Sequence, residues 1–169
     1  MLTRFTLLLG VTLFAVGCHL SAASVSSEIA RSVGGVTINK STDNKAPIPL
    51  GSGLTIVNVF DDFSPGCPTG NRFETIERFD ALRPAGTTVV LIFSEKGFST
   101  QDVENFKAIL PMAESIVQGD IEALRPYLVR GKLLVVLDSK GRLVWQEKVN
   151  MSEQQVMSEL SNLVNPPGK

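Results

Sequence analysis

Cysteine and histidine are scarce in this chain, and their scarcity excludes several kinds of enzyme. The 169 residues include two cysteines, Cys18 and Cys67, and one histidine, His19. A zinc site built from Cys and His needs about four such ligands, so this sequence cannot assemble one. A Ser-His-Asp triad would have to take its histidine from the extreme N-terminus. We therefore expect no metal and no other cofactor, and most hydrolase mechanisms are disfavoured.

The chain also lacks an excess of charge of either sign. It carries 16 basic and 17 acidic residues, for a net charge of −1, and neither sign forms a long run. Binding to nucleic acid depends on neutralising phosphates with a basic stripe, and no such stripe is present. We expect no nucleic-acid partner.

Residues 1–23 are typical of an export signal. The apolar segment TLLLGVTLFAV (6–16) follows one positive charge and is too short to span a bilayer comfortably. Residues 21–23 (SAA) suit an ordinary signal peptidase, whereas AVGC (15–18) resembles the bacterial lipobox, with alanine where leucine is usual. In the second case Cys18 becomes the lipid-modified first residue of the mature protein. A retained N-terminal anchor is a third possibility.

All three routes place the domain outside the cytoplasm, in the bacterial periplasm or at the outer surface. We favour a lipoprotein attached to the membrane through Cys18. This choice affects the other cysteine, because Cys67 is then the only thiol left and no disulfide can form within the chain.

The segment after the signal, 24–50, is expected to be a tether. It is polar and rich in small residues, with one short strand at GVTINK (35–40), and it ends in the Pro/Gly-rich stretch APIPLGSG (46–53). We expect a single domain over 51–165 and a short tail over 166–169.

Within that domain, strand and helix patterns alternate. Apolar β-rich runs predict buried strands, apolar residues at helical spacing after a capping residue predict helices, and the DSKG turn predicts a hairpin. The order implies an α/β fold in which helices cover both faces of a mixed sheet. The predicted strands are 54–60, 87–93, 115–119, 132–137 and 142–149, and the predicted helices are 69–83, 99–110, 120–129 (interrupted at Pro126) and 152–164.

This order, together with two short motifs, resembles the thioredoxin-like redoxins, especially their exported, membrane-tethered thiol-disulfide members. VNVFDDFSPGC (57–67) is similar to the strand and CxxC motif of that family, and YLVRGKLLVVLDSKGRLV (127–144) is similar to its later segment. The resemblance covers about 54–164. It implies a thioredoxin-like fold and a partner that is an external thiol or a redox protein.

Two departures from the family pattern concern function. The first cysteine of CxxC is replaced by Ser64, and the family's cis-proline should fall near Lys132 or Leu133, neither of which is proline. A dithiol oxidoreductase needs one thiolate to attack and a second thiol to resolve the mixed disulfide. Ordinary thioredoxin turnover is therefore disfavoured.

FSPGC (63–67) is also similar to a run found in some peroxiredoxins. That similarity implies that Cys67 is the peroxide-attacking thiolate, that Ser64 hydrogen-bonds it and that Arg130 holds its charge. Those enzymes have a proline seven residues before the cysteine, where this chain has Phe60. The plainer alternatives are a turn or capping role for Ser64 and a solvated loop position for Arg130.

The residues around Cys67 also favour a reactive thiol. Pro68 is a favoured first residue of a helix, which would place the sulfur at a helix N-terminus, where free N–H groups favour a thiolate. Asp61 and Asp62 would raise the pKa of the thiol if they faced it, but a solvated loop is the simpler expectation for both. Cys67 could instead be a small buried apolar residue.

Two functions follow from these observations. The first is an exported thioredoxin-fold protein with a single-cysteine redox centre, acting as a thiol-dependent oxidoreductase or peroxidase. The second is a degenerate module that binds a partner at the same cleft without turnover. We expect Trp145 and Tyr127 to be packing residues, and the sequence leaves the oligomeric state open.

Overall fold

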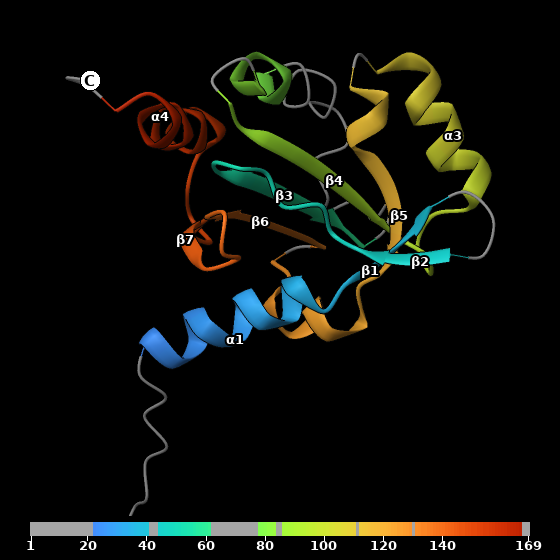
Figure 1. Cartoon of the computed structure of the whole chain (residues 1–169), viewed down its shortest axis with the longest axis horizontal. Helices are drawn as coiled ribbons and strands as arrows, with labels where there is room; N and C mark the ends of the chain where they lie inside the picture. The colour runs from blue at the N-terminus through green and yellow to red at the C-terminus, as the bar shows by residue number, and fades with distance from the viewer. Residues whose placement is uncertain are drawn as a thin grey trace, which may run out of the picture.

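One mixed sheet of seven strands organises the chain, in the order β2-β1-β5-β4-β3-β6-β7 (Figure 1). The computed structural model describes residues 22–40, 44–61, 78–83, 86–110, 112–129 and 131–166. The strands are β1 (Thr37–Lys40), β2 (Asn44–Pro47), β3 (Thr55–Phe60), β4 (Thr88–Ser94), β5 (Ile116–Asp120), β6 (Lys132–Leu137) and β7 (Leu143–Gln146). The helices are α1 (Ala22–Gly34), α3 (Thr100–Ile109) and α4 (Glu153–Val164), with 3-10 turns η3 (Ala113–Ser115) and η4 (Glu122–Tyr127).

β3 lies inside the sheet, and all six of its residues are buried. It pairs in parallel with β4 and antiparallel with β6, so Val57 lies between Val90 and Val135. β-branched residues suit such a strand because their side chains fill both pleated faces. The predicted α/β fold with a central mixed sheet is confirmed.

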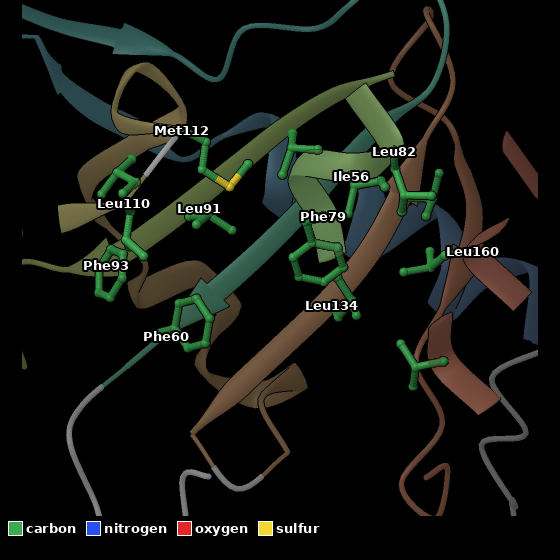
Figure 2. Packing of buried hydrophobic residues seen from close by; sticks show 14 of the residues in the cluster. Ile56, Phe60, Phe79, Leu82, Leu91, Phe93, Leu110, Met112, Leu134 and Leu160 are labelled. Carbon is green, nitrogen blue, oxygen red and sulfur yellow. The ribbon is translucent and has the colours of Figure 1, made fainter. Parts of the chain in front are cut away.

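Alternate side chains of β3 enter two separate cores. Ile56 and Phe60 point to the face that residues 78–83, α3 and α4 cover, where they join a cluster around Phe79 (Figure 2). Val57 and Val59 point to the opposite face, under α1 and η4. In Figure 1 α1 and η4 lie on one side of the sheet, and α3 and α4 lie on the other.

Aromatic rings fill the first core near the end of β3. The ring of Phe93 stacks on Phe60 at a centroid distance of 5.1 Å and on Phe106 at 5.0 Å, and it meets Phe98 edge-on at 4.8 Å. Offset and edge-on pairs are the arrangements that aromatic quadrupoles favour. These rings fix the positions at which β3 and β4 end.

Both predicted capped helices begin as the sequence indicates. The Ser99 hydroxyl accepts a hydrogen bond from the backbone of Asp102, whose carboxylate accepts one from Ser99 N–H, and Ser152 and Gln155 repeat this capping box at the start of α4. Of the predicted helix 69–83, the structure describes residues 78–83, which are helical.

The segment that we expected to be a tether, 24–50, is instead part of the fold. α1 places Ile29 and Val33 in the second core, and each is at most 1% exposed. β1 joins the sheet beside β5 and pairs with β2. The apolar residues Ile29, Val33 and Val36 recur at helical spacing, but small polar residues between them gave the stretch the composition of a linker.

Two terminal predictions fall largely outside the described residues. α1 begins at Ala22, so only the last two residues of the predicted signal, 1–23, are described. Of the predicted tail, 166–169, only residue 166 is described.

Truncating a buried residue of α1 tests whether this helix belongs to the domain. We expect Ile29→Ala to lower the free energy of unfolding by about 2–5 kcal/mol, because it removes a fully buried side chain and leaves a cavity. Arg31→Ala, an exposed change on the same helix, should change it by less than about 0.5 kcal/mol. Urea denaturation measures both. Equal midpoints for the two variants would mean that α1 is a tether after all.

Candidate functional site

The carboxyl ends of three parallel strands meet at one edge of the sheet. Phe60 of β3 lies beside Phe93 of β4, which lies beside Gln118 of β5. β6 runs in the opposite direction and begins at the same edge, with Lys132 opposite Phe60. In open α/β sheets this carboxyl edge is where ligands bind and where chemistry is done. The segment that carries the predicted motif leaves β3 here.

The four predicted site residues lie outside the described residues. Ser64 and Cys67 belong to 62–77, Arg130 is a single undescribed position, and Cys18 belongs to 1–21. The structure therefore neither brings these residues together nor separates them. It describes the chain on either side of them.

The chain flanking the motif meets the chain flanking Arg130. The backbone N–H of Asp61, the last described residue before the motif, donates to the carbonyl of Gly131 at 2.9 Å. Val129 and Lys132 exchange two backbone hydrogen bonds across a tight turn, of 2.8 and 3.2 Å. Gly131 has a φ of 74° there, a conformation that favours glycine. The two sequence stretches from which we predicted the site are thus joined at one place.

Four charged side chains form a connected chain across this edge, which we call the edge network. Arg125 of η4 contacts the Asp61 carboxylate at 2.8 Å through Nη1 and Glu122 at 3.1 Å through Nε. Lys96, which follows β4, contacts Glu122 at 2.6 Å. The edge network therefore ties the end of β3 to η4 and to the turn after β4.

Asp61 is not the solvated loop residue that we expected. Its side chain is only 16% exposed and its carboxylate is paired with Arg125. Asp62 lies outside the described residues. Arg125 was missed in the sequence, where the only available signal was its spacing of three from Glu122, which places the two on one helical face. Nothing in the local sequence indicated Asp61, 64 residues away.

The shifted pKa values of Glu122 and Arg125 favour the charged forms of these two side chains. Hydrogen bonds from Lys96 and then from Arg125 lower the pKa of Glu122. A hydrogen bond to Glu122, followed by the charge of Asp61, raises the pKa of Arg125. The network contains two basic and two acidic side chains, whose formal charges cancel.

A second ion pair stands at the position where the resemblance expects proline. Lys132 contacts Glu147 at 2.8 Å, and their side chains are 29% and 14% exposed. Lys132 also pairs with Phe60 in the sheet. Phe60 stands where the peroxiredoxin resemblance expects proline, and here it is a core residue that is 5% exposed.

A buried amide lies within the strand that leads to the motif. Asn58 of β3 is 4% exposed, and its side-chain oxygen Oδ1 has no hydrogen-bond partner among the residues that the structure describes. Leaving such a group unpaired costs about 1–3 kcal/mol. Asn58 is two residues from both Ile56 and Phe60 in β3, so its side chain points to the same face of the sheet and into the first core.

Trp145 and Tyr127 pack as expected, Trp145 against the first core and Tyr127 against the second. Trp145 Nε1 also donates to Glu159, and burial followed by the nearby charge of Glu28 raises the pKa of Tyr127.

Within the described ranges, no three His, Cys, Asp or Glu side chains gather as a metal site would require. The helices in that part of the chain are also too short or too polar to cross a membrane.

Removing the carboxylate at the centre of the edge network should give a pH-dependent loss of stability. The pKa of Glu122 is lowered from 4.5, so its stabilisation is present above that pH and is lost as the pH falls through the folded-state value. We expect Glu122→Gln to lower the urea midpoint at pH 7 and to differ little from the unsubstituted chain at pH 3. Glu104→Gln, which removes an exposed carboxylate paired within α3, is the control. A pH-independent difference would contradict the network.

Solved structures of other proteins share this architecture. A thiol:disulfide interchange protein from Bacteroides sp. is 12% identical and superposes with a TM-score of 0.54, over 79% of this chain and 88% of its own. Copper-bound yeast Sco1 is 14% identical, with a TM-score of 0.53 over 80% and 94% of the two chains. A thioredoxin-like protein from Porphyromonas gingivalis is 13% identical, with a TM-score of 0.53 over 79% and 92%.

The sequence itself matches no protein-family model and no curated protein. At 12–14% identity the structural likeness defines the fold, which agrees with the resemblance found in the sequence. The chain has a thioredoxin-like fold.

Proposed function

We propose that this chain is an exported, lipid-anchored redox protein that uses Cys67 as its single reactive thiol. The observation that carries the proposal is the position of the segment containing Cys67. It leaves the central strand at Asp61, on the carboxyl edge where β3, β4 and β5 end. With Cys18 acylated, Cys67 is the only thiol of the mature chain.

The proposed reaction needs one thiol from this chain, and external thiols supply the rest. The Cys67 thiolate attacks one oxygen of a peroxide, the O–O bond breaks, and the sulfur loses two electrons to become a sulfenic acid, while the leaving alkoxide or hydroxide takes a proton. An external thiol then condenses with the sulfenic acid, releasing water and forming a mixed disulfide. A second external thiol reduces that disulfide. Attack on a protein disulfide breaks its S–S bond, gives the mixed disulfide directly and releases the other sulfur of the partner as a thiolate.

The surrounding charges are compatible with a thiolate. Asp61 would raise the pKa of a nearby thiol if it stood alone, but its pairing with Arg125 offsets its charge. Because the edge network carries no net charge, stabilisation of the thiolate would fall to the helix N-terminus that the sequence predicts after Pro68 and to Arg130. Ser64 would supply a hydrogen bond to the sulfur.

The second candidate is a binding module without turnover, and two observations favour it. Ser64 replaces the attacking cysteine, and Lys132, held by Glu147, stands where the family has proline. In this case the carboxyl edge contacts a partner through the same surface, and Cys67 is inert.

The rate of Cys67 alkylation separates the two candidates. A thiol with a lowered pKa reacts at pH 6 as its thiolate, so we expect iodoacetamide to modify Cys67 about tenfold faster than it modifies an unstructured peptide thiol. Peroxide should leave a sulfenic acid that dimedone traps. Arg130→Gln should slow alkylation, and Cys67→Ser should abolish labelling in a chain whose Cys18 is blocked. Peptide-like reactivity without a dimedone adduct would favour the binding module.

The anchor is tested at the mature N-terminus. Cleavage before Cys18 leaves α1 intact, whereas cleavage after Ala23 removes its first two residues, and this favours the lipoprotein route. We expect mass spectrometry to find an acylated Cys18 at the N-terminus and Cys18→Ser to release the protein from the membrane fraction. A mature chain beginning at Ser24, without lipid, would refute the anchor and leave the chemistry of Cys67 open.

A further inference from the structure

A groove runs along the edge strand β7 beside the first turns of α1. It has a volume of about 510 Å³ and is lined by Ser26, Val129 and residues 143–149. We call this surface the β7 groove. It lies at the end of the sheet opposite β1 and β2, and α1 begins on the same side of the molecule (Figure 1).

The rim of the β7 groove exposes apolar side chains. Val144 is 46% exposed and Val149 is 63% exposed, and they are two of the four large hydrophobic residues that the described part of the chain exposes. Lys148 lies between them in sequence, is exposed, and has no ion-pair partner among the described residues. Such a pair of valines suits the headgroup region of a membrane, and the cation beside them suits anionic headgroups.

The geometry of β7 argues against an added peptide strand as the occupant. The pairing of β6 with β7 shifts register between Val136 and Leu137, which leaves Val144 outside the regular ladder. A bulge on an edge strand twists its free hydrogen-bonding groups out of line, and proteins use this device to prevent strand addition. The groove is therefore suited to contacts made by side chains.

The distance between the proposed anchor and the groove is short. α1 begins at Ala22, four residue steps after Cys18, which is at most about 14 Å of extended chain. From Ala22 to Ser26 the helix rises about 6 Å. An acyl chain on Cys18 thus holds Ser26 within about 20 Å of the lipid, in a domain roughly 40 Å across. The tether expected from the sequence would have removed this constraint.

We propose that the β7 groove is a membrane-contact face, which rests on the lipid surface when Cys18 is anchored. This inference rests on the proposed anchor and adds an orientation to it. Val144 and Val149 enter the headgroup region, and Lys148 meets anionic headgroups. The anchor alone does not fix the orientation of the domain, and a second contact of this kind fixes it.

The only tryptophan of the chain, Trp145, lines the groove and reports on this contact. The mature chain, beginning at Cys18 and carrying Cys67→Ser, is coupled through Cys18 to a maleimide lipid in vesicles of phosphatidylglycerol and phosphatidylcholine. We expect vesicles with brominated acyl chains to quench Trp145 fluorescence by at least half, and vesicle attachment to reduce quenching by aqueous acrylamide.

A matched pair of variants makes the test specific. Val149 and Ile109 are both 63% exposed, but Ile109 ends α3 on the other side of the sheet. We expect Val149→Asp to abolish most of the bromolipid quenching and Ile109→Asp to preserve it. Equal quenching in the two variants, or none in the anchored parent, would overturn the proposal. Quenching that depends on protein density would instead indicate a second copy of the chain and would also overturn it.

Chemical coupling keeps this result separate from the proposed function. It supplies the anchor whether or not cells acylate Cys18, so loss of the natural lipid does not affect the readout. The reactivity of Cys67 is measured by alkylation of the variant that retains this cysteine. That measurement does not depend on the fluorescence of Trp145.

Discussion

β3 is hydrogen-bonded on both edges and buried on both faces, and the other elements are placed by what this strand requires. Its free N–H and C=O groups need β4 and β6 as partners, and its two rows of side chains need a layer of helices on each side. The same arrangement fixes where the strand ends. Phe60 is locked by the ring of Phe93, so the chain leaves the sheet at Asp61, and whatever chemistry the following segment performs starts from a rigid point.

The second core explains why α1 belongs to the domain. Without α1, the face of β3 and β4 that carries the second core would lose the cover of Ile29 and Val33, and part of its apolar surface would meet water. A linker would have separated the fold from the membrane anchor that we propose at Cys18. Because α1 is instead a layer of the fold, that proposed anchor would constrain the orientation of the domain, and the side of the molecule where α1 begins would face the lipid.

Much of the fold was predictable because its signals are local. Runs of β-branched residues located β3, β4 and β6, and Ser99 and Ser152 located the starts of α3 and α4. The edge network was not predictable, since the ion pair between Asp61 and Arg125 joins residues that only the sheet topology brings together. α1 was missed for a different reason. Its apolar stripe is narrow, and its helical state is set by contact with the second core rather than by propensity. The predicted site residues, Ser64, Cys67 and Arg130, were assigned by motif alone.

A single thiol constrains the partner as well as the chain. The sulfur of a mixed disulfide can be released only by another thiol, and a chain with Cys18 acylated has none to offer. With the anchor that we propose, the carboxyl edge would stay within about 55 Å of the bilayer, which is roughly the domain diameter extended by the short chain between Cys18 and α1. A reductant that completes the proposed cycle would have to work in that layer, as a small diffusible thiol or as a membrane-attached redox protein whose own active edge reaches the same height. A binding module would be confined to the same layer, so in both proposed functions the anchor would select the partner by its distance from the membrane.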